Sequence, residues 1–400
     1  MDRYWEIFVN GYTGYARYMW HEITHPSWHN YFYWLIGVSL IFFVLEVVIP
    51  WRKNQPIPRK DFWLDAFYMF FNFFLFSLVI YNAASDVVVN LFNDAIKWLS
   101  GGFNLQAVNP LRTWPYWAVL LVGFVVRDFI QWWTHRLLHA SEWLWQFHKV
   151  HHSVEQMGFA AHLRYHWMEN VVYRTIEYIP LALLGIGLYD FFVIHIFALT
   201  WGHFNHANIS VDGRVTGGIV GALIGIVLSQ GLLDVQLFDG LTVAGQLGVW
   251  GVSVAAGVWL LGPFMKVLFN SPEMHIWHHS YDLPPDMPKG INFGLTLAIW
   301  DYLFGTAYVP WCGRDIRLGF PGVEQFPKDF VHQNLYGIWL QPKEEIRLTP
   351  NPLPLKASLK QPVHLPVDTT CEAPSDVQPQ QTNPKEQSRS DVHQSVDSTI

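Results

Sequence analysis

The sequence predicts an all-α fold, a multi-pass transmembrane helical bundle with a histidine-rich cap on its cytoplasmic side. Only 14% of the 400 residues are charged and 51% are hydrophobic, whereas a soluble globular protein carries about 25% charged residues. Aromatic residues make up 17%, which is typical of chains with aromatic belts at membrane interfaces. Thirteen of the 19 histidines fall between positions 135 and 279.

The first third of the chain predicts an N-terminal membrane anchor. Residues 1–30 mix polar and aromatic side chains, as expected of an interfacial helix. Residues 31–113 predict a transmembrane hairpin and a connection, because 31–50 and 62–82 each have about the length that crosses a bilayer core of roughly 30 Å. The loop 51–61 carries four Lys and Arg residues, so the positive-inside tendency places it in the cytoplasm.

Residues 114–345 predict the main domain. Its first apolar run, 114–134, reads as an inward span that ends directly before His135. Residues 171–202 are too long for one span and short for two, which predicts a tight hairpin. A second apolar hairpin is expected at 210–261. Because each hairpin returns the chain to the side that it left, all the histidine clusters are expected on the cytoplasmic face.

Residues 346–400 are rich in Pro, Gln, Ser and Thr and lack hydrophobic periodicity, which predicts a disordered polar tail. No block of Lys and Arg indicates nucleic acid as a partner. The localisation expected from the whole pattern is a multi-pass integral membrane protein, in a bacterial inner membrane or in the endoplasmic reticulum membrane.

The histidines recur at spacings of three and four, which place side chains on one helix face, and neutral imidazole is a common metal ligand. Two H-x-x-H-H triplets and several pairs make a solvated helix face a poor explanation. The strong candidate ligands are His135, His139, His148, His151, His152, His275, His278 and His279. The supplementary candidates are His206, His203 and His166.

Eleven candidates exceed the four ligands of a structural zinc and suffice for two metal ions. The sequence has no H-E-x-x-H motif of a zinc protease and no ligand set of a ferritin-like bundle. Nitrogen-rich ligation suits iron, zinc or copper, and these stay open. Asp128, seven residues before His135, and Glu169, three residues after His166, are candidates to orient a ligating imidazole by hydrogen bonding.

Several motifs together resemble one family over roughly residues 115–310. They are D-F-I-Q-W-W-T-H-R-L-L-H, H-K-V-H-H, R-Y-H-W-M-E, H-F-N-H-A-N-I, N-S-P-E-M-H-I-W-H-H-S, I-N-F-G and W-D-Y-L-F-G-T. In this order they resemble the fatty acid hydroxylase / sterol desaturase superfamily of histidine-box membrane oxygenases. The resemblance implies two iron ions held by the eight histidines of the boxes, with His206, then His166 and His203, as supplementary ligands. It also implies that Asn292 lies near the site.

The resemblance further implies a non-haem di-iron monooxygenase or desaturase that uses O₂ to oxidise a lipid, either a sterol, a fatty acyl chain or a related molecule. Electrons would come from a separate redox protein. Hydroxylation and desaturation share these boxes, so both stay open. The apolar segment 210–261 departs from the family, in which the corresponding connection is short. Two other functions stay open as alternatives: a membrane metal-ion transporter, whose ligands would lie near the bilayer midplane, and a non-catalytic metal-binding membrane protein.

Overall fold

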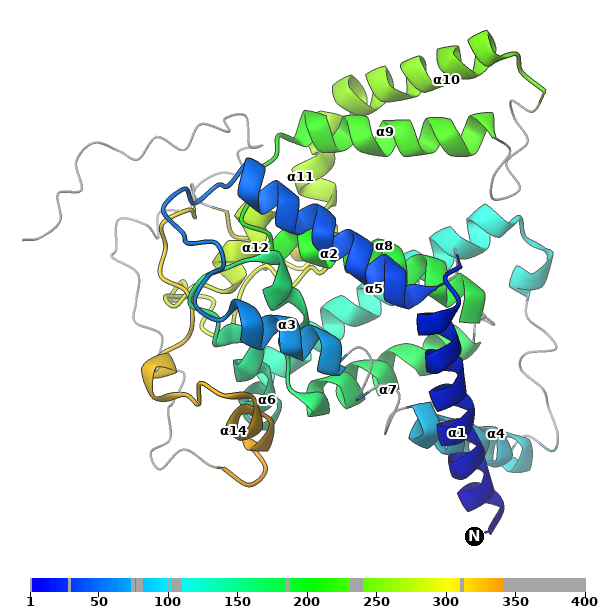
Figure 1. Ribbon diagram of the computed structural model, residues 1–400, viewed down its shortest axis with the longest axis vertical. Helices are drawn as coiled ribbons and strands as arrows, with labels where there is room; N and C mark the ends of the chain where they lie inside the picture. The colour runs from blue at the N-terminus through cyan, green and yellow to red at the C-terminus, as the bar shows by residue number, and fades with distance from the viewer. Residues whose placement is uncertain are drawn as a thin grey trace, which may run out of the picture. The chain divides into compact units, whose positions relative to one another are not determined.

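The chain forms helices joined by loops, and the described residues contain no strand beyond isolated bridge pairs (Figure 1). The computed structural model describes residues 2–27, 30–72, 76, 82–99, 101, 110–183, 188–230, 240–309 and 313–340. The α-helices are α1 (Asp2–Thr24), α2 (Tyr31–Val48), α3 (Phe62–Phe70), α4 (Asn82–Leu99), α5 (Tyr116–Ala140), α6 (Glu142–His152), α7 (Trp167–Leu183), α8 (Leu188–His206), α9 (Gly213–Ser229), α10 (Val243–Ala256), α11 (Met265–Leu268), α12 (Pro272–His278), α13 (Ile299–Leu303) and α14 (Phe330–Leu335). Shorter helical turns are η3 (Pro110–Thr113), η4 (Phe159–Leu163), η6 (Gly257–Leu261), η7 (Gly262–Phe264) and η8 (Val323–Gln325). The all-α prediction is therefore confirmed for this part of the chain.

Within the described part of the chain, two helices are long and apolar enough to cross a membrane. They are Tyr31–Val48, with a mean hydropathy of 2.1, and Val243–Leu268, with a mean hydropathy of 1.6; Gly213–Ser229 is apolar but shorter. The segment expected as a span at 62–82 is described only as far as Asn72 and at Phe76, and the tail expected at 346–400 lies outside the described residues. The number of membrane crossings therefore stays a prediction.

The turn between α5 and α6 is fixed by one serine. α5 begins after Pro115 and continues to Ala140, six residues beyond the expected end of the span. α5 ends at Ser141, whose backbone N–H makes the last helical hydrogen bond, to the carbonyl of Leu137, and whose own backbone is extended (φ −90°, ψ 120°). The Ser141 side chain accepts a hydrogen bond from the N–H of Leu144 and so caps α6. Serine is a favoured N-cap residue. The turn folds α6 back onto α5 and brings the later histidines of the first cluster beside the earlier ones.

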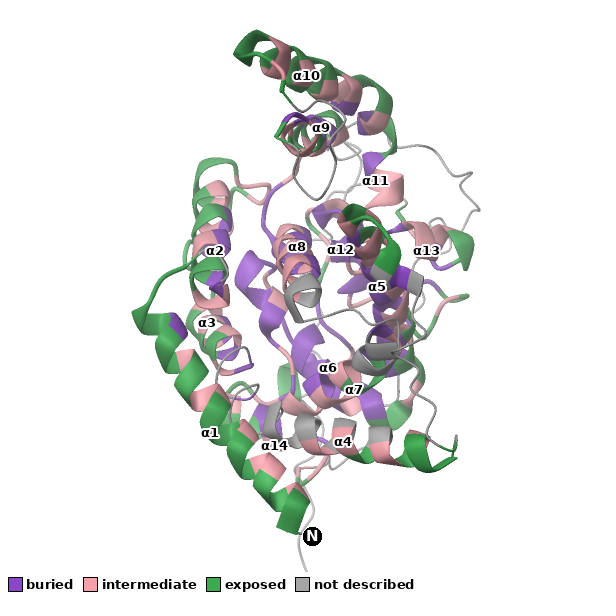
Figure 2. Cartoon of the chain, turned by 90° about the vertical axis from the view of Figure 1, so that its right-hand side faces the viewer, coloured by how far each residue is buried: buried purple, intermediate pink, exposed green. Residues whose placement is uncertain are grey.

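The helices that carry histidines pack on one another. α5 contacts α6, α7 and α8, and α8 also contacts α2 and α12. In Figure 2 the buried colour is concentrated on α6 and α12, whereas α1 and α10 are mainly exposed. The Trp201 indole of α8 donates to the carbonyl of Asn270 at 2.9 Å, immediately before α12. Glu46 of α2 accepts the N–H groups of Phe159 and Asn208, both at 2.8 Å, and so ties α2 to both loops beside α8.

The segment expected as an extra apolar hairpin forms α9 and α10, which lie side by side (Figure 1). Glycines let their backbones approach closely: a Cβ added to Gly221 would lie 2.2 Å from the carbonyl oxygen of Ser253, and one on Gly257 would lie 2.1 Å from that of Gly217. Small residues at helix contacts are typical of membrane helix pairs. The outward side chains of the pair are apolar and exposed, as at Leu247 and Val252.

Candidate metal centre

Among the described residues, nine buried histidines form two groups, and within each group one ring nitrogen of every histidine lies within 4.8 Å of those of the others. The first group contains His135, His139, His148, His152 and His278. The second group contains His151, His206, His275 and His279. Each H-x-x-H-H motif supplies both groups, because residues i and i+4 share a helix face while i+3 is turned toward the neighbouring position. The structure thus brings together all eight histidines of the boxes and the supplementary candidate His206.

The nitrogens within each group have the separation of ligands to one ion. The Nε2 atoms of His135 and His148 are 3.1 Å apart, and those of His152 and His278 are 3.0 Å apart. In the second group, His206 Nε2 lies 3.3 Å from His151 Nε2 and 3.1 Å from His275 Nε2. Imidazoles bound to one ion at about 2.1 Å place their nitrogens roughly 3.0–3.4 Å apart. The residues therefore fit one metal ion in each group.

The second ring nitrogen of several candidate ligands faces a backbone carbonyl. The Nδ1 atoms of His135 and His278 lie 2.7 Å from the carbonyls of Phe293 and Ile291. His206 Nδ1 lies 2.8 Å from the carbonyl of Gly202, and His151 Nδ1 lies 3.1 Å from that of Arg164. When Nδ1 donates to a carbonyl, Nε2 keeps its lone pair for a metal, and such support is usual for ligating histidines.

Burial keeps these imidazoles neutral. All nine are at most 6% exposed, and burial lowers the pKa of each of them. The pKa of His135 falls to about 4 and that of His151 to about 3. Three buried nitrogens, His139 Nε2, His148 Nδ1 and His279 Nδ1, have no hydrogen-bond partner among the described residues. Neutral, unpaired imidazole nitrogens in a buried site are what a metal ion requires.

The two predicted carboxylates have different surroundings. Glu169 Oε2 lies 3.0 Å from His148 Nδ1, at ion-pair distance but without hydrogen-bond alignment. Burial raises the pKa of Glu169. Asp128 faces no histidine directly: it accepts hydrogen bonds from the N–H groups of Thr296 and Leu297, both at 3.2 Å, and from the Trp300 indole at 2.9 Å. Glu169 is therefore placed to orient a candidate ligand, whereas Asp128 holds the loop before α13 in place through these hydrogen bonds.

Asn292 fixes the same loop through hydrogen bonds of its side chain to two other segments of the chain. The Asn292 amide donates to the carbonyls of Met274 and Tyr308, at 2.9 and 2.8 Å, and its oxygen accepts the N–H of Tyr308 at 2.7 Å. Its φ of 51° lies in the left-handed region, which asparagine tolerates better than most residues. Asn292 thus crosslinks α12 to the loop whose carbonyls, on the residues at either side of it, face His278 and His135.

The sequence analysis did not identify Asp301, a second carboxylate that binds backbone N–H groups of the same loop. This buried carboxylate accepts the N–H groups of Phe293 and Gly294, at 2.9 and 2.8 Å, and the Trp132 indole at 3.0 Å. Burial raises its pKa. The motif W-D-Y-L-F-G-T contains Asp301, so the residue could have been noticed in the sequence. Its distance of 22 residues from the end of the third box, however, does not indicate which groups its carboxylate contacts.

Two supplementary candidates lie outside both groups. His166 uses both ring nitrogens elsewhere: Nε2 lies 2.8 Å from the carbonyl of Asn334, and Nδ1 accepts the N–H of Met168 at 3.0 Å. His203 lies between Ser39 Oγ, at 3.2 Å from Nε2, and His162 Nδ1, at 3.0 Å from Nδ1. The structure therefore brings neither His166 nor His203 to the metal positions, despite their helical spacing to other histidines.

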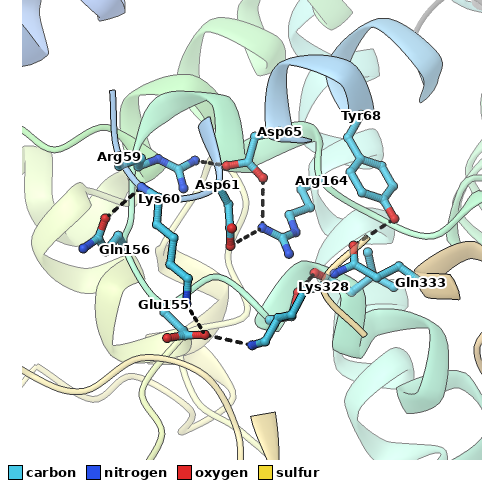
Figure 3. A network of polar contacts seen from close by, with 12 residues as sticks. Arg59, Lys60, Asp61, Asp65, Tyr68, Glu155, Gln156, Arg164, Lys328 and Gln333 are labelled. Atoms are coloured by element: carbon cyan, nitrogen blue, oxygen red, sulfur yellow. Dashed lines mark hydrogen bonds and ion pairs between the residues drawn. The ribbon is translucent and has the colours of Figure 1, made fainter. Parts of the chain in front are cut away.

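A buried cluster of ion pairs lies next to His151 of the second group (Figure 3). The Arg164 guanidinium lies 3.0 Å from Asp61 Oδ2 and 3.2 Å from Asp65 Oδ1, and Asp65 also pairs with Arg59. Arg164 and Asp65 are fully buried. Since the carbonyl of Arg164 faces His151 Nδ1, this cluster anchors α3 and its preceding loop to a candidate ligand. It also occupies Arg59, one of the cations counted in the loop 51–61.

Two cavities adjoin the histidines from different sides. One, of about 120 Å³, is lined mainly by α5, α7 and α8, with residues of α6 and η4, and touches four of the candidate ligands, His135, His148, His151 and His206. The other, of about 20 Å³, is bounded by Lys289 and Trp145 and touches His139, His152 and His278. The centre is therefore reached from both of its faces, by a larger and a smaller space.

Comparison with known proteins identifies the same histidine-bearing region. Residues 120–221 match the family model of the fatty acid hydroxylases. The chain is 27% identical over 220 residues to the ornithine lipid hydroxylase OlsE of Rhizobium tropici, covering 55% of this chain and 50% of that protein. It is 24% identical over 276 residues to the alkylglycerol monooxygenase of Xenopus tropicalis, covering 68% of this chain and 46% of that protein.

A shorter match reaches the very-long-chain aldehyde decarbonylase GL1-10 of Oryza sativa subsp. japonica, 41% identical over 67 residues, 16% of this chain and 22% of that protein. The chain thus spans half or less of the length of these relatives. No solved structure matches it. The family match, the relatives and the order of the histidine boxes agree: the chain carries a fatty acid hydroxylase domain, matched at residues 120–221, of the fatty acid hydroxylase / sterol desaturase superfamily.

Proposed function

We propose that this protein is an integral membrane oxidoreductase that binds two iron ions and uses O₂ to hydroxylate or desaturate a lipid. The observation that carries the proposal is the division of nine buried histidines into two adjacent groups. A structural zinc would need only four ligands. Because α6 and α12 each supply both groups, two ions would lie side by side, as a single dinuclear centre.

The reaction balances with an external electron donor. Hydroxylation consumes a C–H bond, O₂, two electrons and two protons and gives C–OH and water. Desaturation consumes two adjacent C–H bonds with the same O₂, electrons and protons and gives a C=C bond and two waters. Two iron ions, when bound, would supply the activation of O₂, and a separate redox protein would supply the electrons.

The chain's own residues would hold the metals and exclude water. Carbonyls on the loop before α13 set the tautomers of His135 and His278. Asp301, Asn292 and Asp128 fix that loop. The named relatives, a lipid hydroxylase and an alkylglycerol monooxygenase, support a lipid as the substrate. The exposed apolar faces of α2 and of the α9–α10 pair support a membrane location.

We further propose that the centre faces the cytoplasm, in a bacterial inner membrane or in the endoplasmic reticulum membrane. The cations of the loop 51–61 support this orientation, although three of them make contacts within the chain: Arg59 pairs with Asp65, Arg52 donates to the carbonyl of Arg314, and the exposed Lys60 pairs with Glu155. The exposed side chains of Lys53 and Lys60 then carry most of the positive-inside signal. A cytoplasmic centre would be within reach of a soluble electron donor.

Lipid profiling tests the proposal. Cells that produce the full chain, and cells that produce the His151→Ala/His278→Ala double variant at equal abundance, would be grown under ¹⁸O₂. Mass spectrometry of their lipids should reveal a species that needs the intact chain. Gain of one ¹⁸O would establish hydroxylation, and loss of two hydrogens without label would establish desaturation. An unchanged lipid profile, in cells shown to contain the metal-loaded protein and its reductant, would contradict the proposal.

A further inference from the structure

We propose that the cavity between α5, α7 and α8 binds the uncharged polar end of the lipid, a hydroxyl or amide group, so that the oxidised carbon lies near that end rather than far along the chain. This inference rests on the proposed function and adds a substrate class to it. It depends on the position of the cavity, on the polar groups in its wall, and on one buried acceptor that lacks a donor.

The position of the cavity places its contents against both metal groups. Its wall includes His135 and His148 of the first group and His151 and His206 of the second. A molecule in this space therefore lies beside the whole candidate centre. The volume of about 120 Å³ suits a small portion of a lipid and not an entire acyl chain.

The wall carries a buried ion pair. The Arg127 guanidinium of α5 pairs with the Glu177 carboxylate of α7, and the side chains are each 4% exposed. Gln131 Nε2 donates to Glu177 Oε2 at 3.4 Å, and Arg127 Nη2 lies 3.1 Å from His195 Nδ1. All four residues border the cavity. Taking two charges out of water is costly, and apolar residues of similar volume often serve stability as well or better, which favours a role in binding.

The polar wall is close to the metal positions along one helix. Gln131 precedes His135 by one helical turn, or about 6 Å along the axis, and Arg127 precedes it by about 12 Å. A polar group held by these side chains would leave only a short piece of the molecule to reach the candidate centre. Leu163, Ala198 and Leu199 also line the cavity and offer apolar contacts for the adjoining carbon atoms.

One buried acceptor in the wall lacks a donor. Asn205 is 2% exposed, and its Nδ2 donates to the carbonyl of Leu295. Its Oδ1 has no hydrogen-bond partner among the described residues. Buried polar atoms in native proteins nearly always have a partner, and Asn205 both borders the cavity and precedes the candidate ligand His206. A bound hydroxyl or amide would donate the missing hydrogen bond.

The charge of the wall selects the kind of polar group. Arg127 and Glu177 already neutralise each other, so the pair offers further donors and acceptors but no unpaired charge. A neutral group that both donates and accepts can bind at either of these places, which lie about 15 Å apart along α8, from His195 beside the ion pair to Asn205 beside the metal groups. Arg174 also borders the cavity, which makes an anionic end the competing possibility and gives the experiment its contrasting probe.

Photolabelling of the full-length protein in phospholipid nanodiscs tests this inference. Two hexadecanol probes carry a diazirine, one beside the hydroxyl carbon and the other at the methyl end; a hexadecanoate probe carries it beside the carboxylate. The labelled residues are read by peptide mass spectrometry, with metal-loaded and with metal-stripped protein. We expect the hydroxyl-end probe to label residues of the cavity wall such as Tyr173 and Ala198, at least tenfold more than either of the other probes does.

Two variants and a control sharpen the result. Glu177→Gln removes half of the ion pair, and loss of a hydrogen bond to a charged group lowers binding roughly tenfold to a hundredfold. Ala198→Leu fills the cavity without changing charge and should abolish labelling even if Glu177→Gln folds poorly. Glu324→Gln alters an exposed carboxylate paired with Arg317 and should leave labelling unchanged. Metal content of each variant serves as the folding check.

Other results would overturn the inference. Preferential labelling of the wall by the methyl-end probe, stronger labelling by hexadecanoate, or equal labelling of wild type and metal-replete Ala198→Leu each contradicts it. No labelling of the wall by any probe would mean that the cavity holds water only. The inference and the proposed function fail separately. Labelling by the hydroxyl end without any oxygenated lipid would contradict only the oxygenase, and oxidation near the methyl end would contradict only the inference.

Discussion

The Nε2 atoms of His152 and His278 lie 3.0 Å apart, although 126 residues separate them in the chain. Their immediate neighbours, His151 and His279, belong to the other metal group. A pair of adjacent histidines in each motif is therefore split between two metal positions. This alternation explains why both motifs end in two consecutive histidines, and it makes the loss of one ring distinguishable from the loss of its neighbour.

Removal of single rings should empty the groups selectively. We expect the wild-type protein to carry close to two metal ions per chain. The His278→Ala and His275→Ala variants should each lose activity. His278→Ala should release the ion of the first group first, and His275→Ala that of the second. Elemental analysis of purified protein gives the stoichiometry. His332→Ala is the matched control, because this exposed ring pairs with Asp329; full metal content in both ligand variants would contradict the assignment.

Glu169 should matter through its position beside His148. Glu169→Gln keeps the shape but replaces the carboxyl group whose oxygen lies 3.0 Å from His148 Nδ1. Loss of a group that orients a ligand typically lowers metal affinity by about 10–100-fold. Competition with a chelator measures the change, and Glu155→Gln, which alters an exposed carboxylate, should retain wild-type affinity. Equal chelator sensitivity of the two variants would show that Glu169 does not orient a ligand.

A methyl group at Gly290 should displace His139. Gly290 has a φ of 123°, and a Cβ there would lie 2.9 Å from His139 Nδ1. Gly290→Ala should therefore weaken metal binding in the first group as well as strain the backbone. Gly305→Ala separates the two effects, because Gly305 has a φ of 70° and open space around it. If both variants lose metal equally, backbone strain and not contact with His139 explains the loss.

Breaking the ion cluster of Figure 3 should destabilise the fold and disturb His151. Asp65→Asn leaves Arg59 and Arg164 without their shared buried carboxylate. Removing one partner of a buried ion pair costs about 3–5 kcal/mol. We expect a lower midpoint of thermal unfolding and reduced metal content. Asp315→Asn, at an exposed pair with Arg314, should change the midpoint by much less; a wild-type midpoint in Asp65→Asn would refute the proposed anchoring.

His166 should make stability depend on pH. Burial lowers its folded-state pKa to about 4, below the usual 6.5 or so. Between these values the unfolded chain binds more protons, so stability falls as the pH drops from about 6.5 to about 4 and levels below that. The full shift corresponds to about 3 kcal/mol. His166→Gln keeps a donor toward Asn334 without titrating.

Unfolding curves of the metal-stripped protein across this pH range measure the contribution of His166. The wild type should lose more stability on acidification than His166→Gln, because the other buried histidines contribute equally in both. Parallel pH profiles for the two proteins would mean that His166 is not held neutral at the contact between α7 and α14.

Spacing along helices predicted much of the candidate site and failed where long-range contacts decide. Intervals of three and four put His148, His151 and His152 on one side of α6, but they do not reveal the division into two groups, which needs α8 and α12 in place. His166 has the same spacing to His162, yet its ring meets Asn334, 168 residues away. No local pattern contains that contact.

Hydropathy likewise located the helices better than it located their ends. The apolar run 114–134 predicted the body of α5, but the helix continues to Ala140 because a change of polarity does not break helical hydrogen bonds, whereas the Ser141 cap does. The prediction of spans weighed mean apolarity, and α5, which carries Arg127, Asp128 and Arg136, is not among the described helices that meet the length and composition of a crossing. Those side chains have internal partners, as the Arg127–Glu177 ion pair illustrates.

The α9–α10 pair begins and ends at one place. A Cβ on Gly213, the first residue of α9, would lie 2.6 Å from the carbonyl oxygen of Gly262, just beyond η6. The two ends of this segment of about fifty residues, Gly213 and Gly262, are thus in contact beside the histidine-bearing helices. A short turn could bridge the same gap, so this segment is the natural position for deletions or fusions that spare the candidate metal centre.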